Sequence, residues 1–512
     1  MELRTNRTAV TAAEPTGSIL QEQGIELDYV LPDYYPDVCK LLKCFVTPTI
    51  LSENISGDRL SYELRAEVRI LYCSEDSNVL QCVTQTLLFS RTADLPAGEN
   101  VTAEIFPAID YVNCRAVSRR RLDVRGAVTI RIRTCAASGK EVLSDVFGKG
   151  MQLRKIPVSF PAKRFQASQS IILTEDLELG STQPPLLHIV RCAAKPSDLS
   201  QKLVSGKLNV QGTLRLQLLY ACERDGDGSL EPLSFTLPFS QLLDMEGIEE
   251  QDDVRVSCSV VSCDLKPAAD SGGDVRGLRC EAELRVQCRA VRTATEQLVC
   301  DAFSTEHPCT CRMLELLTES APVPFSEMQV CSAKLPCTDG ELDCVYDAWC
   351  EVPSLTHTCS DGEVLLTGML RWCVLVRESG GMPRLLEREE PFEHRFSPGT
   401  MGEDDILQVT ANAENCSYTL ASASEVSLKS ELRMEGTVTH CQKTAVLSDI
   451  EVQEEQTHPH CFALKLYYGK AGEPIWDIAK RCHTSVEAIM DENDLTQDTL
   501  TDSGMLLIPI VS

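Results

Sequence analysis

The sequence is poor in basic residues and in aromatic ones. Its 512 residues include 48 Lys and Arg against 76 Asp and Glu, for a formal charge of −28 at pH 7, and only 3 Trp. A chain this acidic repels phosphate backbones and anionic lipid headgroups, so we expect neither nucleic acid nor a membrane surface as a partner. The excess of acidic residues is best explained as a means of keeping the protein soluble. A basic protein partner is the alternative.

Long hydrophobic runs are also missing. No segment approaches the roughly 18 consecutive apolar residues of a membrane-spanning helix. The opening residues, MELRTNRTAVTAAEPTGSILQEQG, hold no apolar core of the kind that secretory signals need. We therefore expect a protein that is made and kept in a cytoplasm, without direct insertion into a membrane.

Motifs of catalysis and metal binding are absent as well. We find no phosphate-binding P-loop, no GxSxG and no HExxH motif. The stretches 307–311 (HPCTC) and 458–461 (HPHC) lack the CxxC spacing of structural zinc sites and lie in apparent linkers. The acidic stretch 225–231 lacks the spacing of a calcium loop and falls where a hairpin turn is needed. We expect no enzyme, no catalytic residue, no metal and no cofactor.

Cysteine, by contrast, is abundant, with 25 residues. In a reducing cytosol these are expected to be free thiols. Many fall where a small buried hydrophobic residue would serve, namely Cys73, Cys114, Cys222, Cys280, Cys288 and Cys373. Later oxidation could crosslink an assembly through some of the others, which keeps a crosslinked structural component among the candidate functions.

One strand pattern occurs three times. It reads LSYELRAEVRILY at 60–72, LNVQGTLRLQLLY at 208–220 and VLLTGMLRWCVLV at 364–376. Alternation of period two over this length predicts a strand with one buried face. Glycine stands at the same place in two copies, as Gly212 and Gly368. It predicts a bend or a close backbone approach there.

A second strand pattern follows in each copy, at 122–132, 278–288 and 426–436. Its outward positions are charged and its third inward position is small (Gly126, Ala282 and Ser430), which is typical of a strand half-buried against another sheet. Between the two patterns each copy has a strand-like stretch with a phenylalanine and then a cysteine: Phe89 and Cys114, Phe239 and Cys263, Phe392 and Cys416.

The spacing of the copies sets the size of the unit. Equivalent points lie 148 residues apart from Tyr72 to Tyr220 and 156 apart from Tyr220 to Val376. A repeat of about 130–150 residues is too long for a solenoid. We predict that each copy is an antiparallel β-sandwich or a similar two-layer β fold.

The opening of the first copy, YVLPDYYPDVCKLLKC from Tyr29, resembles the spore coat-associated (SPOCS) domain family. With the tandem strand patterns, the resemblance covers about residues 20–455, although the third copy lacks the PPxL-type opening. SPOCS domains often occur in tandem in sporulation proteins and sometimes precede a C-terminal LysM module.

The last fifty residues form a separate pattern. Leu464, Leu466 and Tyr468 predict a short strand, and Met505 to Pro509 a closing one. Between them Ile475, Ile478, Ala479 and Cys482 follow helical spacing. Residues 484–487 (TSVE) read as a capping box that opens a second helix with Val486, Ile489 and Met490 buried. The order is strand, helix, helix, strand.

This tail resembles a LysM domain through WDIAKR at 476–481, TSVEAIMDEN at 484–493 and SGMLLIP at 503–509. LysM domains commonly bind N-acetylglucosamine polymers in a groove between two loops. Here a Gly-Glu-Pro loop replaces the Gly-Asp-Thr-like loop of glycan-binding members, which removes a hydroxyl and a backbone donor. The resemblance implies that a partner- or glycan-binding groove is formed by Gly472, Glu473, Pro474, Ile475, Trp476, Asn493, Asp494 and Leu495.

Two interpretations of Trp476 remain open. It is either part of the core of the module or a partly exposed aromatic anchor for a protein partner.

We thus expect a mainly β chain, in which three tandem antiparallel β-sandwich-like domains precede a small α+β (βααβ) LysM domain. The predicted divisions are an extension at 1–24, SPOCS-like domains at 25–160, 161–312 and 313–456, and the LysM domain at 457–512.

This arrangement resembles the family of SipL-type spore coat morphogenetic proteins. The resemblance implies a non-enzymatic scaffold in the mother-cell cytoplasm, recruited to the forespore surface and the spore coat. Its LysM domain would dock on the coat basement-layer ATPase, and other contacts would reach further coat proteins. The alternative is a peptidoglycan- or N-acetylglucosamine-binding protein of the spore envelope.

Overall fold

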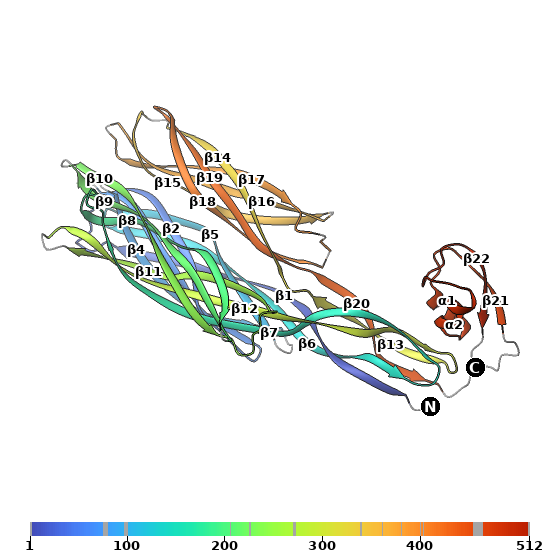
Figure 1. The fold of residues 1–512 in the computed structure, drawn as a ribbon. Coiled ribbons are helices and arrows are strands. Elements are labelled where there is room, and N and C mark those ends of the chain that lie inside the picture. Colours follow the sequence, from blue (N-terminus) through green and yellow to red (C-terminus); the bar gives the residue numbers. More distant parts are fainter. Residues whose placement is uncertain are drawn as a thin grey trace.

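The computed structural model describes residues 3–74, 80–96, 101–204, 206–224, 227–269, 273–337, 340–360, 362–379, 381–399, 401–402, 404–453 and 464–509. The chain is mainly β, built from antiparallel sheets, with two short helices near its end (Figure 1). Among the described residues, neither helix is long and apolar enough to cross a membrane.

The first six strands form one two-layer unit. They are β1 (Arg4–Val30), β2 (Val38–Ser56), β3 (Arg59–Ser74), β4 (Leu80–Asp94), β5 (Thr102–Ser118) and β6 (Arg121–Phe147). One sheet has the order β2-β3-β4 and the other β1-β6-β5, so the first and last strands of the unit pair with each other.

The second unit repeats this topology. Its strands are β7 (Met151–Glu178), β8 (Leu186–Val204), β9 (Lys207–Arg224), β10 (Asp227–Asp244), β11 (Asp253–Ala269) and β12 (Val275–Ser304). They form sheets of order β8-β9-β10 and β7-β12-β11.

The third unit differs because its outer strand pair is interrupted. Its strands are β13 (Cys309–Glu319), β14 (Val323–Pro336), β15 (Leu342–Ser360), β16 (Glu363–Glu378), β17 (Pro383–Phe396), β18 (Ile406–Ser422), β19 (Glu425–Thr439) and β20 (Cys441–Val452). Sheets β15-β16-β17 and β14-β19-β18 match those of the other units, and β13 pairs with β20 separately.

The predicted strands are confirmed where alternation was clearest. The first pattern lies in β3, β9 and β16, and the second in β6, β12 and β19. The predicted close approach at glycine is also confirmed. A Cβ added at Gly212 would lie 2.7 Å from Cζ of Phe239, which stands opposite it on β10. In the first unit the same place holds Leu64, opposite Phe89.

The prediction of one buried face is wrong at the ends of the central strands. Leu71, Leu219 and Leu375 occupy equivalent outward positions, yet each is at most 3% exposed. They form a cluster with Trp349 of β15 and Cys373 of β16, in which all three units meet. The alternation fails there because both faces of each sheet are buried.

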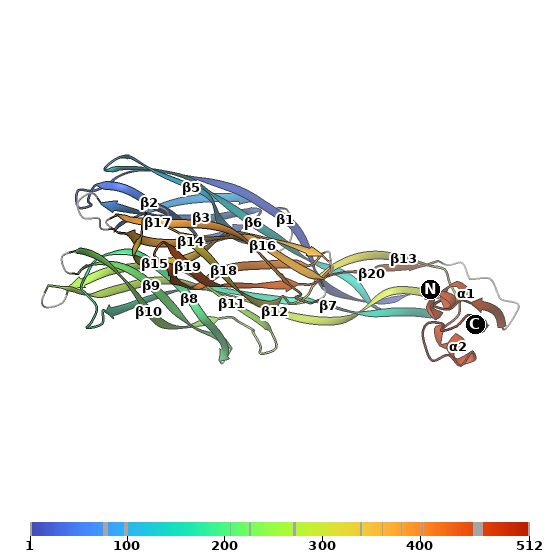
Figure 2. The same ribbon diagram turned by 90° about the horizontal axis from the view of Figure 1, so that it is seen from above.

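Polar contacts join the units around this cluster. Arg191 of the second unit lies 2.7 Å from Asp347 of the third, and Arg69 of the first donates to the backbone oxygen of Cys192 at 2.5 Å. Lys43 of the first unit pairs with Glu351 and Glu387 of the third. The units therefore pack side by side around a common centre instead of following one another in a line (Figure 2).

The outer strand pairs extend beyond the sandwiches and form a stalk. β1 with β6, β7 with β12, and β13 with β20 run together toward the tail (Figures 1 and 2). Their shared apolar core consists of Val10, Ala12, Val142, Val158, Phe160, Leu298, Leu316 and Val446. From Arg4 onward, the predicted extension 1–24 is thus part of β1, and the predicted divisions at 160 and 312 fall inside β7 and β13.

Candidate functional site

The tail module, residues 464–509, contains β21 (Leu464–Gly469), α1 (Ile475–Cys482), α2 (Val486–Glu492) and β22 (Gly504–Pro509). This is the predicted order of elements. The apolar face of α1 is buried as expected, with Ile475, Ile478, Ala479 and Cys482 in the core. Pro474 precedes the helix, and His483 ends it with a left-handed backbone at φ 54°.

The start of α2 differs from the prediction by one residue. Ser485, not Thr484, is the N-cap, and its side chain accepts a hydrogen bond from the backbone N–H of Ala488 at 3.1 Å. Thr484 instead donates to the backbone oxygen of Pro509 at 2.5 Å. Thr484 therefore ties the helical layer to β22.

The first predicted side of the groove, 472–475, is a turn whose backbone donors are already used. The N–H of Gly472 bonds the oxygen of Leu500 at 2.8 Å, and that of Ile475 bonds Asp498 at 2.8 Å. Pro474 has no N–H, and the N–H of Glu473 bonds back to Lys470. Ile475 is fully buried. A sugar approaching this turn would have to be held by other groups.

The second predicted side, Asn493 to Leu495, is also engaged in the fold. The Asn493 side chain donates to the backbone oxygen of Leu507 at 2.7 Å and accepts from its N–H at 2.7 Å. Leu495 packs against the module core, and Asp494 is exposed with φ 51°. The first turn is bonded to Leu500, further along the chain, and not to this loop: Gly472 donates to the oxygen of Leu500, and the N–H of Leu500 donates to that of Glu473.

Glu473 is a hub of the first turn. Its carboxylate accepts from the Tyr467 hydroxyl at 2.7 Å, from the Lys470 N–H at 3.1 Å and from Arg481 at 3.2 Å. These bonds, led by the one from Tyr467, hold the pKa of Glu473 below its ordinary value. The Gly-Glu-Pro loop is therefore stabilised by its glutamate.

Trp476 contacts another part of the same chain. Its indole N–H donates to Asp301 at 2.8 Å, and its ring meets Phe303 edge-on at a centroid distance of 5.0 Å. Lys480 also bonds Asp301, at 2.6 Å. A register shift between Val299 and Asp301 in β12 leaves Cys300 as an extra residue, which redirects the strand there. Trp476 is thus partly buried where the module rests on the stalk.

The large apolar side chains that are exposed in the described module all lie on the outward face of the two-stranded sheet. Leu464, Leu466 and Tyr468 of β21 stand opposite Pro509, Leu507 and Met505 of β22. Five of these side chains are exposed: Leu464 48%, Leu466 64%, Tyr468 67%, Met505 68% and Leu507 37%. We call these five residues the tail face. Because Leu506 and Ile508 fill the inward positions, both faces of β22 are apolar.

The tail face continues to an open strand edge. Asn493 bonds both backbone groups of Leu507, so these groups point away from β21. In an antiparallel pair the opposite residue, Leu466, then directs its own N–H and C=O to the far side of β21. Within the described part of the chain, β21 pairs only with β22. Such an edge can accept a further strand.

The sequence patterns correctly predicted that these residues lie in strands, but the predicted binding residues lie in the neighbouring loops and at the start of α1. The available signal was the composition of β22, where Met505, Leu506, Leu507 and Ile508 leave neither face polar. A strand that is apolar on both faces in a module this small cannot bury both within its own fold.

Of the stretches considered as metal sites, one packs within the stalk, and the others lie wholly or partly outside the described residues. Cys309 and Cys311 pack against the apolar end of the stalk, and the Cys311 thiol donates to the oxygen of Ala302. Stretch 458–461 lies outside the described residues, and so does part of 225–231, between β9 and β10. No group of three or more potential metal ligands occurs among the residues that the structure describes.

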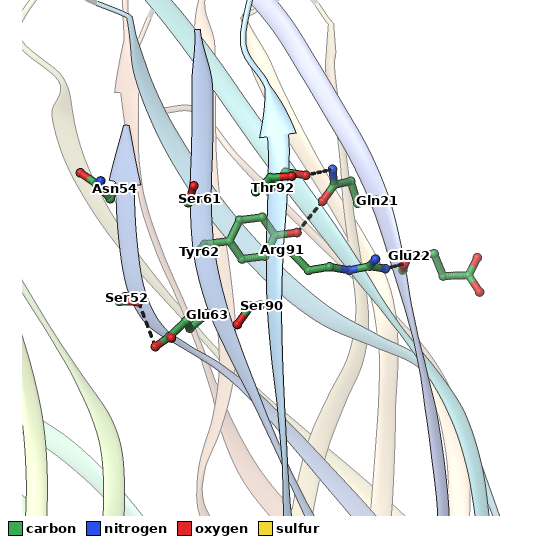
Figure 3. A pocket seen from close by; sticks show the side chains of 10 residues that line it. All are labelled: Gln21, Glu22, Ser52, Asn54, Ser61, Tyr62, Glu63, Ser90, Arg91 and Thr92. Carbon is green, nitrogen blue, oxygen red and sulfur yellow. Dashed lines mark hydrogen bonds between the residues drawn. The ribbon is translucent and has the colours of Figure 1, made fainter. Parts of the chain in front are cut away.

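A polar hollow of about 730 Å³ lies on the first unit (Figure 3). The residues that line it bond mainly to one another, through side chains and backbone oxygens. Tyr62 donates to Gln21 at 2.5 Å, Gln21 donates to the oxygen of Thr92 at 2.9 Å, and Arg91 donates to that of Glu22 at 2.7 Å. These bonds connect β1 of one sheet with β3 and β4 of the other. We therefore assign the hollow a structural role in closing this side of the sandwich.

Comparison with known families relates one unit to a described domain. The model of a family described as SipL, SPOCS domain matches residues 185–267. The matched segment spans β8, β9, β10 and most of β11. It supports the resemblance of the second unit to SPOCS domains and a relation of the chain to SipL-type proteins of sporulation. No curated protein and no solved structure matches the chain.

Proposed function

We propose that this protein is a non-enzymatic scaffold of spore coat assembly that docks through its tail module, a LysM domain, on the coat basement-layer ATPase. The three β units, read as tandem SPOCS domains, then connect the docked end to other coat proteins. The observation that carries the proposal is the tail face, an exposed apolar surface beside an open strand edge.

The position of the tail face suits such a role. The module lies at the tip of the stalk, away from the sandwiches (Figures 1 and 2). Its helical side meets the stalk through Trp476 and Lys480, whereas Leu466 and Tyr468 remain exposed. A partner bound at the tail face would leave the three sandwiches accessible for further contacts. On a polymerised ATPase, several weak contacts would be strengthened by effective concentration.

Charge limits the kind of partner strand that fits. Lys465 and Arg481 lie on the β21 side, where Arg481 bonds Tyr467 and pairs with Glu473, and acidic residues follow α2. Two copies joined edge to edge through β21 would bring like charges together. A partner segment with alternating apolar and acidic residues would meet the apolar face and the basic edge at once.

The alternative function, binding of peptidoglycan or N-acetylglucosamine polymers, receives less support. Sugar recognition needs free hydrogen-bonding groups. In the turn 470–475, each backbone N–H is bonded within the module: those of Lys470 and Ala471 to side chains, and the others to backbone.

Binding of the full-length chain to both candidate partners distinguishes the two functions. We expect Leu466→Asp to weaken binding to the polymerised ATPase by about 2 kcal/mol, or about thirtyfold in Kd, as for a central apolar contact residue. Ile172→Asp is the matched control, because Ile172 is 75% exposed on β7. It should bind like the unmodified chain.

Retention on peptidoglycan or chitin provides the second arm of the experiment. The proposal would be wrong if the unmodified chain bound these glycans and not the ATPase. It would also be wrong if Leu466→Asp and Ile172→Asp bound the ATPase equally well.

A further inference from the structure

Each β unit has a seam where edge strands of its two sheets lie side by side. These strands are β2 and β5 in the first unit, β8 and β11 in the second, and β15 and β18 in the third. At every seam each strand carries a half-buried cysteine that packs against the core of its own unit. The seam pairs are Cys44 and Cys114, Cys192 and Cys263, and Cys350 and Cys416.

The thiols of two seam pairs influence each other. Cys44 and Cys114 are each the main cause of the shift in the other's pKa, and the same holds for Cys192 and Cys263. In the third unit, Cys350 and Cys416 interact electrostatically. Cysteines on neighbouring strands can form a disulfide when their Cα atoms lie within about 7 Å of each other.

The two members of each of these pairs differ in character. The Cys44 thiol lowers the pKa of the Cys114 thiol, whereas Cys114 and burial raise the pKa of Cys44. The Cys263 thiol lowers the pKa of Cys192, helped by the charge of Arg69, and the pKa of Cys263 rises to about 12. Since the thiolate is the nucleophile, Cys114 and Cys192 are the reactive members.

A third thiol in the second unit does not compete on geometric grounds. Cys263 also raises the pKa of Cys280, but the two lie diagonally on neighbouring strands, because Cys263 stands opposite Ala282. Diagonal residues of an antiparallel pair are about 7–8 Å apart. Cα atoms more than about 7 Å apart cannot be bridged without movement of the backbone.

We propose that Cys44 with Cys114 and Cys192 with Cys263 are redox-active pairs, which close to intramolecular disulfides when the protein meets a hydroperoxide. The reactive thiolate attacks a peroxide oxygen and breaks the O–O bond, which gives a sulfenic acid and a hydroxide. This hydroxide takes up the proton that the thiol released and becomes the first water. The second thiol attacks the sulfenic sulfur, and the hydroxide that leaves takes up its proton as the second water. Two thiols are oxidised by two electrons, and hydrogen peroxide is reduced to two water molecules.

The surroundings of the second pair offer a route for a small oxidant. Cys192 and Cys263 line a cavity of about 360 Å³ between the units, together with Arg69, Arg191 and Trp349. The bond between them would fasten β8 to β11, and that in the first unit β2 to β5. Oxidation would thus close the seams of folded units without joining separate chains.

Peptide mapping of the oxidised full-length protein tests the proposal. The reduced chain is treated with hydrogen peroxide, its remaining thiols are blocked, and it is digested without reductant. We expect crosslinked peptides joining Cys44 to Cys114 and Cys192 to Cys263, each lighter by two hydrogen atoms than the sum of its reduced parts. The protein should remain monomeric on a non-reducing gel when Cys39 and Cys359, which are exposed among the described thiols, and Cys135 and Cys461, whose exposure is not described, are replaced by serine.

Single replacements test the assigned roles. In Cys44→Ser the intermediate has no partner, so Cys114 should be labelled by a sulfenic acid reagent such as dimedone. In Cys114→Ser, Cys44 should stay unlabelled, and the link between Cys192 and Cys263 should still form in both variants. Other pairings, intermolecular products alone, or equal labelling of Cys44 and Cys114 would overturn the proposal. Because mapping of the unmodified chain is decisive by itself, poor folding of a variant does not remove the test.

Discussion

The strands of the three β units and of the tail module share the same alternation of side chains. The outward face of the sheet is buried in the β units at the centre of the molecule and exposed in the tail module. At the centre of the molecule, Leu71, Leu219 and Leu375 would be exposed in an isolated unit and are buried by the neighbouring units. In the tail, Leu466 and Tyr468 occupy a comparable outward face and stay exposed. The three units therefore bury one another's outward apolar side chains, whereas no described part of the chain covers the tail face. From this difference we infer that the tail is the part that binds a partner.

The largest expected effect is on stability at the centre. Leu219→Ala removes a side chain that is 2% exposed in the cluster shared by all three units. We expect a loss of about 2–5 kcal/mol in the free energy of unfolding, as for other large-to-small core changes. Leu466→Ala should change it by less than about 0.5 kcal/mol, since Leu466 is a surface residue. Urea unfolding measures both.

Equal losses in these two variants would break the comparison. They would mean that the tail face is covered within the folded chain. A loss in neither variant would mean that the units do not depend on the central cluster.

The next effect concerns the junction between the two regions. Trp476→Ala should abolish localisation at the forespore, either because the tail module unfolds or because it loses its anchor. Asp301→Ala tells whether the cause is loss of a partner contact or loss of the stalk contact, because it leaves Trp476 in place. It removes the acceptor of the Trp476 and Lys480 bonds, together with a local bond from the Ala302 N–H. If the stalk contact matters, we expect Asp301→Ala to expose α1 to faster hydrogen exchange and to impair localisation too.

The opposite result is equally informative. If Trp476 serves as an anchor for the partner, Asp301→Ala should release the indole and strengthen binding to the ATPase. Asp477→Ala, on the exposed side of α1, is the control and should leave localisation unchanged. If Asp301→Ala behaved like this control in both hydrogen exchange and localisation, the contact of Trp476 and Lys480 with Asp301 would have no part in localisation.

Local patterns in the sequence predicted the strands well, and contacts between distant strands were harder to predict. Period-two alternation located β3, β9 and β16, and Gly212 indicated the close approach of Phe239. The run of apolar residues that ends each central strand, as in LQLLY at 216–220, was the trace of a second buried face. Nothing local shows which surface covers that face, because the covering residues lie some 150 positions away. The same limit explains the stalk contact of Trp476 with Asp301.

The candidate site could be predicted from the sequence only in part, for a different reason. The loops of the tail module were selected through a family resemblance, and the structure uses Ile475 and Asn493 within the fold. The tail face followed from β21 and β22 together, and it needed their register to become visible. Strand pairing places Leu466 beside Leu507, which hydrophobic composition alone cannot do.

The smallest expected effect is an acid sensitivity confined to the tail module. Hydrogen bonds, chiefly from Tyr467, hold the pKa of Glu473 below its ordinary value of 4.5. A carboxylate with a lowered pKa in the folded state adds stability above its unfolded pKa and loses that contribution as the pH falls through the folded value. Protection factors for hydrogen exchange in 470–482, which correct for the intrinsic pH dependence of exchange, should therefore fall below about pH 4.5. Glu473→Gln should remove this dependence, while replacement of the exposed Asp502 by Asn should keep it. An unchanged acid response in Glu473→Gln would show that the charges of the β units, and not the loop of the tail module, govern its behaviour in acid.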